Sequence, residues 1–559
     1  MRKDNRVPPR TKAAMPSVAT ATTMKDLKDT LWKAADKLRG SMDASQYKDV
    51  ILGLVFLKYV SDAFEERREA ILAECVADGL SENDAAPLLE DIDEYRRAGA
   101  FWVPERARWG YLARNAKGRV ATVDEPEASV GQLVDDAMAH LMGANPPLAG
   151  TLPTIFNSIS VDQRRLGELV DLFSSARFTG VMADGTKVSK ARDVLGEVYE
   201  YFLEKFARAE GKRGGEFFTP PSVVRVLVEV LEPYRGRVYD PACGSGGMFV
   251  QAEKFLESHG ADPQAISVYG QELNQRTWQL ARMNLAIHGL SGQLGPRWGD
   301  TFARDLHPDV PMDYVMSNPP FNIKDWARST DDARWKYGVP PAGNANYAWI
   351  QHILSKLAPT GSAGVVMANG SMSSNSGGEG EIRAQLVEAD LVSCMVALPT
   401  QLFRSTGIPV CVWFVAKDKG ARAGEVLFID ARNMGHMVDR AERALSDEDI
   451  AKIASTYHAW KRTPSQVELV ETLSLVEPVE TETTYADIPG FCYSATLAEI
   501  KNAGYALTPG RYVGAAEAED DGEPVEEKIA RLTKELFEQF DESARLEKVV
   551  REQLERVRA

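Results

Sequence analysis

The sequence predicts an α/β protein with a mostly parallel sheet, preceded by a helical domain and followed by a terminal helix. Three patterns support this fold class. Residues 24–160 place apolar side chains at helical spacing, without clear strand-like alternation. From about residue 190 to 435, short β-rich runs alternate with helical stretches, which is typical of βαβ units. Near the end of the chain, apolar residues follow the 4-3 spacing of a coiled-coil helix.

The N-terminal helical domain is expected over residues 24–165, after a disordered tail at residues 1–23. The segment "MKDLKDTLWKAADKLRG" places Leu27, Leu31 and Leu38 at helical spacing, and the glycine that follows Arg39 offers a stop. In the next helix "VILGLVFLKYV" is apolar nearly all round, which indicates burial among other helices. Taken alone, this domain is interpreted as a structural bundle. The tail has no apolar segment, so no secretory leader is expected.

The sheet is expected to have seven strands, within a domain at residues 166–480. The predicted strands are residues 236–240, 266–272, 313–320, 362–370, 391–399, 410–418 and 425–430. Helical segments such as "GGMFVQAEKFLESHG" separate the early strands, so these are expected to pair in parallel. Only a short segment around "KGARAG" separates the last two, which is hairpin spacing. We therefore expect a terminal antiparallel hairpin to close one edge of the sheet.

The C-terminal part begins with an acidic, proline-containing extension and linker, expected over residues 481–524. The final helix is expected over residues 525–559, with polar residues interrupting its apolar seam at three positions. The apolar members of the seam are Val525, Ile529, Leu532, Leu536, Leu546, Val550 and Val557. This pattern fits a coiled-coil-type helix that docks on a partner, and a solvated terminal helix is the alternative.

The composition limits the possible classes of protein. Hydrophobic content of 44% and charged content of 26% are ordinary for a soluble protein, and no apolar run is long enough to span a membrane. The 5 cysteines lie far apart without a CxxC pair, and the 7 histidines do not cluster, so we expect a cytoplasmic protein with neither disulfides nor a metal site. The net charge of −16 is unexpected for a chain that binds DNA alone, because phosphate contacts require basic residues.

A glycine-rich turn follows the first predicted strand in "VYDPACGSGGMF". Gly244, Gly246 and Gly247 allow the backbone to approach a ligand closely, and Asp240 ends the strand that points at it. The pattern is not GxGxxG, so a nicotinamide site is not favoured, although ordinary strand–helix turns also produce such sequences. Glu272 ends the next strand, where acids commonly bind ribose hydroxyls.

A third acid, Asp300 in "WGDTF", precedes the strand that ends in "DYVMSNPPFN". Three acids around one glycine turn repel a pyrophosphate, but they suit a nucleoside that carries a positive centre. The residues therefore favour S-adenosyl-L-methionine over NAD or ATP as the cofactor.

The motif "SNPPFN" supplies the groups needed to methylate an amino group conjugated to an aromatic ring. The Asn318 side-chain oxygen and the Pro319 carbonyl are two acceptors for that amino group, which frees its lone pair for in-line attack. Pro319 and Pro320 fix the backbone, so this carbonyl is held outward. Phe321 offers a face for base stacking, worth about 1–3 kcal/mol, on a base flipped out of the duplex. A chance Asn-Pro turn is the structural alternative.

From about residue 24 to the end, the chain resembles the methylation subunit (HsdM) of type I restriction–modification systems. The resemblance is carried by "LWKAADKLRG", "EFFTPPSVV", "DPACGSGGMF", "YGQELN", "SNPPFN", "NANYAWIQHIL" and "YALTPGRYVG". It implies a Rossmann-like methyltransferase domain that uses S-adenosyl-L-methionine to methylate N6 of adenine in DNA.

The resemblance also implies further cofactor contacts. The segment of Glu216, Phe217, Phe218, Thr219, Pro220 and Pro221 would line the methionine end of the cofactor pocket. Glu216 would pair with the α-ammonium, and Thr219 is also placed to cap the following helix. Ser245 to Gly247 and Glu272 carry over as further cofactor contacts.

The partners implied by the resemblance explain the acidic charge. A separate specificity subunit (HsdS) would recognise the double-stranded DNA, flanked by two methylation subunits, with the C-terminal helix as a contact. A restriction subunit (HsdR) would join the larger complex and supply the ATP-dependent steps, because this chain has no GxxxxGK[ST] motif.

Two other functions remain open from the sequence. Asn-Pro-Pro loops also serve methyltransferases that act on glutamine amides in proteins, because a planar amide nitrogen poses the same chemical problem. A catalytically idle, cofactor-binding scaffold is the second alternative. The large helical domain and the terminal helix favour DNA as the substrate.

Overall fold

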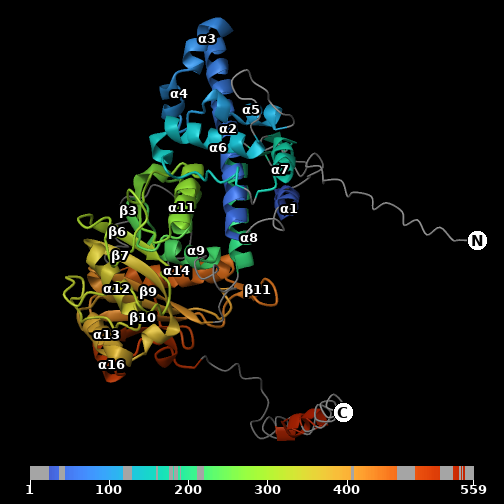
Figure 1. Ribbon diagram of the computed structural model, residues 1–559. Helices are drawn as coiled ribbons and strands as arrows, with labels where there is room; N and C mark the ends of the chain where they lie inside the picture. Colours follow the sequence, from blue (N-terminus) through green and yellow to red (C-terminus); the bar gives the residue numbers. More distant parts are fainter. Residues whose placement is uncertain are drawn as a thin grey trace, which may run out of the picture.

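The computed structural model describes residues 24–36, 44–116, 129–158, 161–175, 180–181, 187–188, 191–210, 219–403, 408–462, 485–515 and parts of 533–547. A helical region, blue to cyan in Figure 1, lies against an α/β region that runs from green to orange. The predicted disordered tail at residues 1–23 and most of the predicted terminal helix lie outside the described residues.

The helical region contains α1 to α8. Their bounds are α1 Met24–Ala35, α2 Ala44–Ala77, α3 Glu82–Leu89, α4 Ile92–Arg97, α5 Trp109–Asn115, α6 Val130–Ala144, α7 Gln163–Ser175 and α8 Ala191–Glu210. Two short strands, β1 Gly180–Val181 and β2 Lys187–Val188, pair before α8. As predicted, the middle of α2 is apolar all round and buried, for example at Val50, Leu54 and Phe56. None of the helices in the described ranges is long and apolar enough to cross a membrane.

The main sheet has nine strands in the order β13-β10-β8-β9-β7-β6-β3-β4-β5. Their bounds are β3 Gly236–Asp240, β4 Ile266–Gly270, β5 Gly292–Gln293, β6 Met312–Ser317, β7 Leu357–Ala368, β8 Val392–Ala397, β9 Val410–Ala416, β10 Glu425–Asp430 and β13 Cys492–Thr496. A separate small hairpin joins β11 His436–Met437 to β12 Arg443–Ala444. Strands β3 to β7 pair in parallel, so their carboxyl ends meet at one edge of the sheet.

Helices cover both faces of this sheet (Figure 1). They are α9 Pro221–Leu231, α10 Gly247–Ser258, α11 Gln275–Ile287, α12 Asn346–Lys356, α13 Glu379–Glu388, α14 Asp447–Lys461 and α16 Leu497–Asn502. Neighbouring strand residues alternate between two cores: Val238 packs with α9, α10 and α14, whereas Tyr239 packs with α12 and α13. The predicted α/β fold with a mostly parallel sheet is therefore confirmed.

The predicted terminal hairpin is wrong. β9 lies between β7 and β8 and is antiparallel to both, whereas β10 pairs in parallel with β8 and antiparallel with β13. The short connection after β9 therefore crosses the end of β8 instead of turning back beside β9. All residues of β8 are buried, so β8 is suited to the position between two neighbours. With β5 and β13 added at its two edges, the sheet has more than the seven strands expected.

The helical region shares a core with the α/β region. Leu280, Met283 and Ile287 of α11 belong to the same buried cluster as α2 and α8. The Tyr59 hydroxyl donates a 2.8 Å hydrogen bond to the Ile287 carbonyl. Helix α11 therefore lies between the helical region and the carboxyl ends of β3 and β4, where the candidate site is found.

Candidate methyl-transfer site

The predicted site residues gather at the carboxyl ends of three adjacent parallel strands, the usual ligand position in such sheets. Asp240 ends β3, Glu272 follows β4, and Asn318 directly follows β6. A cavity of about 450 Å³ opens here, with Thr219, Pro221, Asp240, Ser245, Gly247 and Asn318 among its lining residues. Pro220 precedes α9 beside it. Glu216, Phe217 and Phe218 lie outside the described residues.

Asp240 is fully enclosed at the end of β3 and is 2% exposed. Its Oδ1 atom accepts a 2.6 Å hydrogen bond from the Ser317 hydroxyl and a 3.0 Å bond from the Ala242 amide. Burial nevertheless raises the pKa of the Asp240 carboxyl to about 7, because a charged carboxylate loses its hydration there. Asp240 is therefore set to change its protonation near neutral pH.

The glycine-rich turn needs its glycines for two different reasons. Gly244 and Gly246 have φ angles of 54° and 81°, which L residues rarely adopt, and α10 begins directly after Gly246. Gly247 has no such backbone constraint. A Cβ atom added there would meet no described atom within 4 Å, so it would project into open space. The space beside Gly247 therefore belongs to the cavity, where it is available to a ligand.

Glu272 and Asp300 support the same strand ends through backbone contacts. The Glu272 carboxylate accepts hydrogen bonds from the amides of Gly244 at 3.1 Å and Asn274 at 2.8 Å, and burial raises its pKa. The Asp300 carboxylate accepts from the amides of Phe302 at 2.7 Å and Ala303 at 3.1 Å. Neither side chain is among those lining the cavity beside Asp240. The structure thus places both acids at the predicted strand ends but outside that cavity.

The Asn318 amide is held by a residue far away in the sequence. Its Nδ2 atom donates a 2.9 Å hydrogen bond to the Thr219 hydroxyl. Its Oδ1 atom is buried and has no hydrogen-bond partner among the described residues. A buried acceptor without a partner costs about 1–3 kcal/mol, so such atoms commonly mark functional sites.

The backbone after Asn318 is fixed by prolines and by a pair of asparagines. Pro319 and Pro320 have no N–H to donate, which ends β6 at Ser317. Asn322 has a φ angle of 53°, and its amide donates a 2.9 Å bond to Asn346 Oδ1. Asn346 Nδ2 donates in return to Asn322 Oδ1 at 2.8 Å. This reciprocal pair anchors the loop to the first residue of α12.

Phe321, the last residue of the predicted catalytic motif, is partly buried against the core. Its ring packs edge-on against Phe403, with 6.2 Å between the ring centroids and 77° between the planes. This contact orients the ring beside the Asn318 loop.

The family of the chain follows from its sequence. The N-6 DNA methylase family model matches residues 190–521, and the HsdM N-terminal domain model matches residues 27–173. The chain belongs to the HsdM family of N-6 DNA methylases.

Relatives of the HsdM-family chain agree with this assignment. It is 49% identical to the type I restriction enzyme HindI methylase subunit of Haemophilus influenzae, over 76% of this chain and 92% of the relative. It is 38% identical to the MjaIX methylase subunit of Methanocaldococcus jannaschii, over 95% of this chain and 91% of the relative.

Solved structures support the fold of this HsdM-family chain. The type I methyltransferase subunit from Streptococcus thermophilus matches with a TM-score of 0.68 at 24% identity, covering 88% of this chain and 100% of that chain. A modification subunit of a putative type I restriction enzyme from Vibrio vulnificus matches with a TM-score of 0.56 at 18% identity, covering 87% and 94%.

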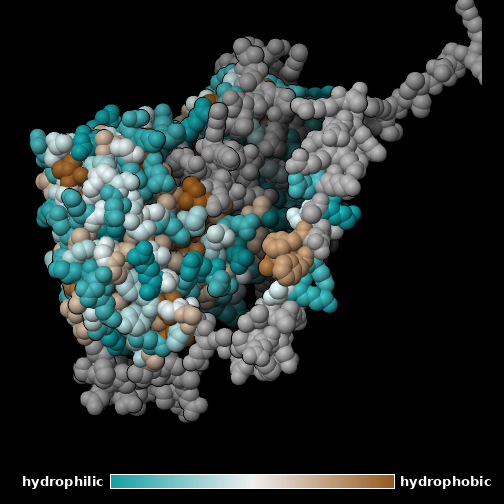
Figure 2. All heavy atoms as spheres, turned by 90° about the horizontal axis from the view of Figure 1, so that it is seen from below, coloured by the Kyte–Doolittle hydropathy of each residue, from teal (hydrophilic) through white to brown (hydrophobic). Residues whose placement is uncertain are grey.

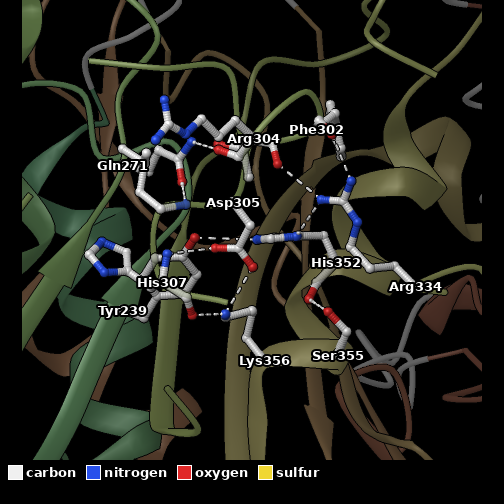
Figure 3. Close-up of polar contacts among 12 residues, drawn as sticks. Tyr239, Gln271, Phe302, Arg304, Asp305, His307, Arg334, His352, Ser355 and Lys356 are labelled. Atoms are coloured by element: carbon white, nitrogen blue, oxygen red, sulfur yellow. Dashed lines mark hydrogen bonds and ion pairs between the residues drawn. The ribbon is translucent and has the colours of Figure 1, made fainter. Parts of the chain in front are cut away.

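A buried polar network holds the loop that carries Asp300 in the HsdM-family chain (Figure 3). Gln271 donates to the carbonyls of Gly299 at 3.1 Å and Arg304 at 2.8 Å. Arg334 donates to the carbonyls of Thr301 at 2.9 Å and Phe302 at 2.7 Å. Neither residue was predicted from the sequence, because no short sequence pattern indicates a hydrogen bond between residues about 30 positions apart.

The base of the same network is an ion pair between Lys356 and Asp305 at 2.9 Å, and Lys356 also donates to the His307 carbonyl. His352 lies beside it, and its Nε2 is 3.3 Å from the Tyr239 hydroxyl (Figure 3). Burial lowers the pKa of His352 to about 3, so its ring stays neutral at physiological pH. The network therefore supports the loop.

The helical region contributes a wall of the cavity, which the sequence did not predict. Glu197, Glu200, Tyr201 and Glu204 of α8 line the cavity, together with Lys28 of α1. Lys28 pairs with Glu197 at 2.8 Å, and Tyr201 donates to Asp29 at 2.6 Å. In this HsdM-family chain the predicted helical domain at residues 24–165 thus reaches the cavity through Lys28 of α1, whereas α8 lies within the N-6 DNA methylase match at residues 190–521.

Asn284 is another residue that the sequence did not single out. Its Nδ2 atom donates a 2.9 Å bond to the Ser245 carbonyl in the glycine turn. Its Oδ1 atom is buried and without a hydrogen-bond partner in the described part of the chain. Asn284 and Asn318, whose amide oxygens both lack a partner within the ranges that the structure describes, therefore line one cavity.

Proposed function

We propose that the chain transfers a methyl group from S-adenosyl-L-methionine to N6 of a flipped-out adenine in duplex DNA. The observation that carries this proposal is the Asn318 amide, whose oxygen has no hydrogen-bond partner among the described residues and which lines the cavity beside Asp240 and the glycine turn. Membership of the N-6 DNA methylase family supports the same reaction.

The residues present fit S-adenosyl-L-methionine. The open space beside Gly247 accepts ligand atoms, and the carboxyl groups of Asp240 and α8 suit a cation. Glu216 would pair with the α-ammonium, and Phe217, Phe218, Pro220 and Pro221 would form the wall beside it. Glu272 would bind ribose hydroxyls and Asp300 would be a further cofactor contact, so the cofactor would extend beyond the cavity beside Asp240, which neither acid lines. When bound, S-adenosyl-L-methionine supplies an electrophilic methyl group on its sulfonium.

The loop of Asn318 to Phe321 prepares the adenine amino group. Asn318 Oδ1 and the Pro319 carbonyl oxygen accept hydrogen bonds from its two N–H groups, so that the nitrogen lone pair is freed for in-line attack. Asn318 has no useful proton affinity, and the excess proton leaves to water after transfer. The adenine must be flipped out, because the site cannot reach an amino group within a stacked duplex. Phe321 then stacks on the everted base.

A separate specificity subunit recognises the DNA sequence. Two methylation subunits bind each specificity subunit, and a restriction subunit joins the larger complex. The support is the net charge of −16, which disfavours DNA binding by this chain alone. Leu536, Phe537 and Phe540 in the described stretches near residues 533–547 are 51–61% exposed, as a docking helix requires. The face in Figure 2 is otherwise largely hydrophilic, with small separate apolar patches.

The domain organisation follows the predicted division, with a helical domain at residues 24–165, the methyltransferase domain at 166–480, an extension at 481–524 and the docking helix at 525–559. The family models match residues 27–173 and 190–521, so the first match extends past the proposed boundary at residue 165. The helical domain also helps to enclose the DNA. We place the complex in the cytoplasm.

The test is substitution of Asn318 in the complex with the specificity subunit. Asn318→Ala is expected to lower the rate of methyl transfer at least about 100-fold, because one of two positioned acceptors is lost. Binding of S-adenosyl-L-methionine and assembly should remain close to wild type. The measurement is transfer of labelled methyl to unmethylated duplex DNA, followed by detection of N6-methyladenine.

Two outcomes contradict this proposal. Methyl transfer by Asn318→Ala at the wild-type rate would show that Asn318 does not take part in catalysis. Labelling of a protein glutamine by the wild-type complex without DNA would assign the chain to amide methylation instead.

A further inference from the structure

We propose that Thr219 is a positioning residue for methyl transfer, and that its hydroxyl turns the Asn318 amide so that the carbonyl oxygen faces the incoming amino group. This inference rests on the proposed function, because it concerns the orientation of the acceptor on which that function depends. The sequence predicted Thr219 only as a cofactor contact and as a helix cap.

The helix-capping role is not observed. The N-cap of α9 is Pro220, and no side chain makes a capping hydrogen bond there. The Thr219 hydroxyl instead accepts the 2.9 Å hydrogen bond from Asn318 Nδ2, across 99 positions of the sequence. The segment before α9 is thereby connected directly to the loop after β6.

This contact decides which end of the amide is available. A carboxamide carries an NH₂ group at one end and a carbonyl oxygen at the other, and rotation of its plane by half a turn exchanges the two. With Nδ2 donating to Thr219, Oδ1 is directed to the opposite side, where it has no partner among the residues described. An amine donor requires the oxygen on that side, since an NH₂ group there would repel it.

The rest of the loop is already fixed, so the amide plane is the main remaining freedom. Ser317, the residue before Asn318, donates its hydroxyl to Asp240 at 2.6 Å. Asn322, beyond the two prolines, is held by the reciprocal pair with Asn346. Neither contact constrains rotation about the last side-chain bond of Asn318. Thr219 is the group that does so.

The expected signature is a loss of rate without a loss of cofactor affinity. Thr219→Val keeps the shape but removes the acceptor, and it should lower the single-turnover rate about 10-fold to 100-fold. Affinity for S-adenosyl-L-homocysteine should change by less than about 3-fold, because the cavity wall is retained. Thr219→Ser, which keeps the hydroxyl, should recover most of the rate.

A matched control is available in Thr151→Val. The Thr151 hydroxyl is buried and has no partner in the described residues, and Thr151 lies in the turn after Leu148 of the helical region. Its removal should leave the rate and the affinity unchanged, which separates the loss of a specific acceptor from the general effect of a buried Thr→Val change.

The decisive experiment combines Thr219→Val with Asn318→Asp in the complex with the specificity subunit. A carboxylate has two equivalent oxygens and therefore no orientation to be chosen. If Thr219 acts through the amide, Thr219→Val should lower the rate of methyl transfer when residue 318 is Asn, but not when it is Asp. An equal loss in both backgrounds would overturn the inference, and so would an unchanged rate in Thr219→Val alone.

The remaining outcomes are also distinguishable. A raised KM for S-adenosyl-L-methionine with an unchanged rate would make Thr219 only a cofactor contact, contrary to the proposal. Absence of adenine methylation in the wild-type complex would instead contradict the proposed function. Melting temperatures of all variants identify any that fail to fold. If Thr219→Val fails to fold, the rate of Thr219→Ser is compared with that of the wild type.

Discussion

Asp240 is the residue whose environment has the clearest consequence for donor binding. It is enclosed, it lines the cavity, and burial raises its pKa to about 7. A neutral carboxyl cannot pair with a cation, whereas a carboxylate can. A bound cationic donor therefore favours the ionised form and lowers the pKa of this group.

The affinity for S-adenosyl-L-methionine is accordingly expected to depend on pH. Below about 7 the free protein carries a protonated Asp240, so the affinity should fall by up to about tenfold per pH unit as the pH decreases. Above that value the affinity should become constant. Calorimetric titration between acidic and mildly alkaline pH measures this directly.

Asp240→Asn provides the control for the pH effect. The amide keeps a similar shape without a titrating proton, so binding should be weaker and its pH dependence flat. A pH profile in the variant as steep as that of the wild type would assign the dependence to another group.

At the scale of elements, α8, α10 and α11 meet around His288. Its ring nitrogens lie 3.1 Å from Glu200 of α8 and 3.3 Å from Glu253 of α10, and Glu200 also pairs with Lys254 at 2.7 Å. Burial lowers the pKa of His288, but its hydrogen bonds to the two glutamates outweigh this, and the net shift is upward. The His288 ring thus joins three helices beside the cavity, and this setting favours its protonated form.

The stability that His288 contributes should decrease as the pH rises. A raised folded pKa means that the contribution is fully present below the unfolded value near 6.5 and is lost above the folded pKa. His288→Gln should therefore lower the melting temperature most at mildly acidic pH and little in alkaline solution. A constant difference between the two proteins across this range would exclude the ion pairs as its cause.

Glu200 gives the complementary dependence at lower pH. Burial raises its pKa, but contacts with His288 and Lys254 outweigh this and lower it to about 2. Its contribution is present above the unfolded value of about 4.5 and is lost as the pH falls toward 2. The junction of the three helices is therefore most stable between these acidic and near-neutral limits.

At the scale of the whole molecule, the helical region of α1 to α8 lines the cavity beside Asp240 and shares a buried core with α11. Helices α1 and α8 form one wall, and α11 connects the glycine turn to the buried cluster of α2. Arg282 of α11 also donates to the carbonyls of Pro147 and Ala149 in the helical region. A displacement of the helical region would therefore move α11 and, with it, the residues that line the cavity.

The acidic surface leads to a prediction for the isolated chain. With a net charge of −16, it should be repelled by DNA phosphates. Methylation of duplex DNA by the purified chain alone is expected to be below about one-hundredth of the rate with the specificity subunit. Efficient site-specific methylation by the single chain would contradict this expectation.

Local features were predictable from the sequence because their causes are local. The glycines at 244 and 246 were recognised from a strand–turn–helix pattern, and both have φ angles that favour glycine. The proline pair after Asn318 likewise ends β6, although the strand stops at Ser317 and not at residue 320 as expected. Long-range pairs were not predicted: Ser317 with Asp240, Asn322 with Asn346, and Arg334 with the Asp300 loop carry no periodic signal.

The sequence by itself determined the alternation of strands and helices, the chemistry of the turn and the Asn-Pro-Pro loop, and the family. These depend on residue type and short spacing, which the chain carries regardless of its neighbours. Only the tertiary structure decided that β9 lies inside the sheet, that α8 walls the cavity, and that Thr219 holds the Asn318 amide. The physical reason is that strand order and side-chain partners are chosen by packing among segments far apart in the chain.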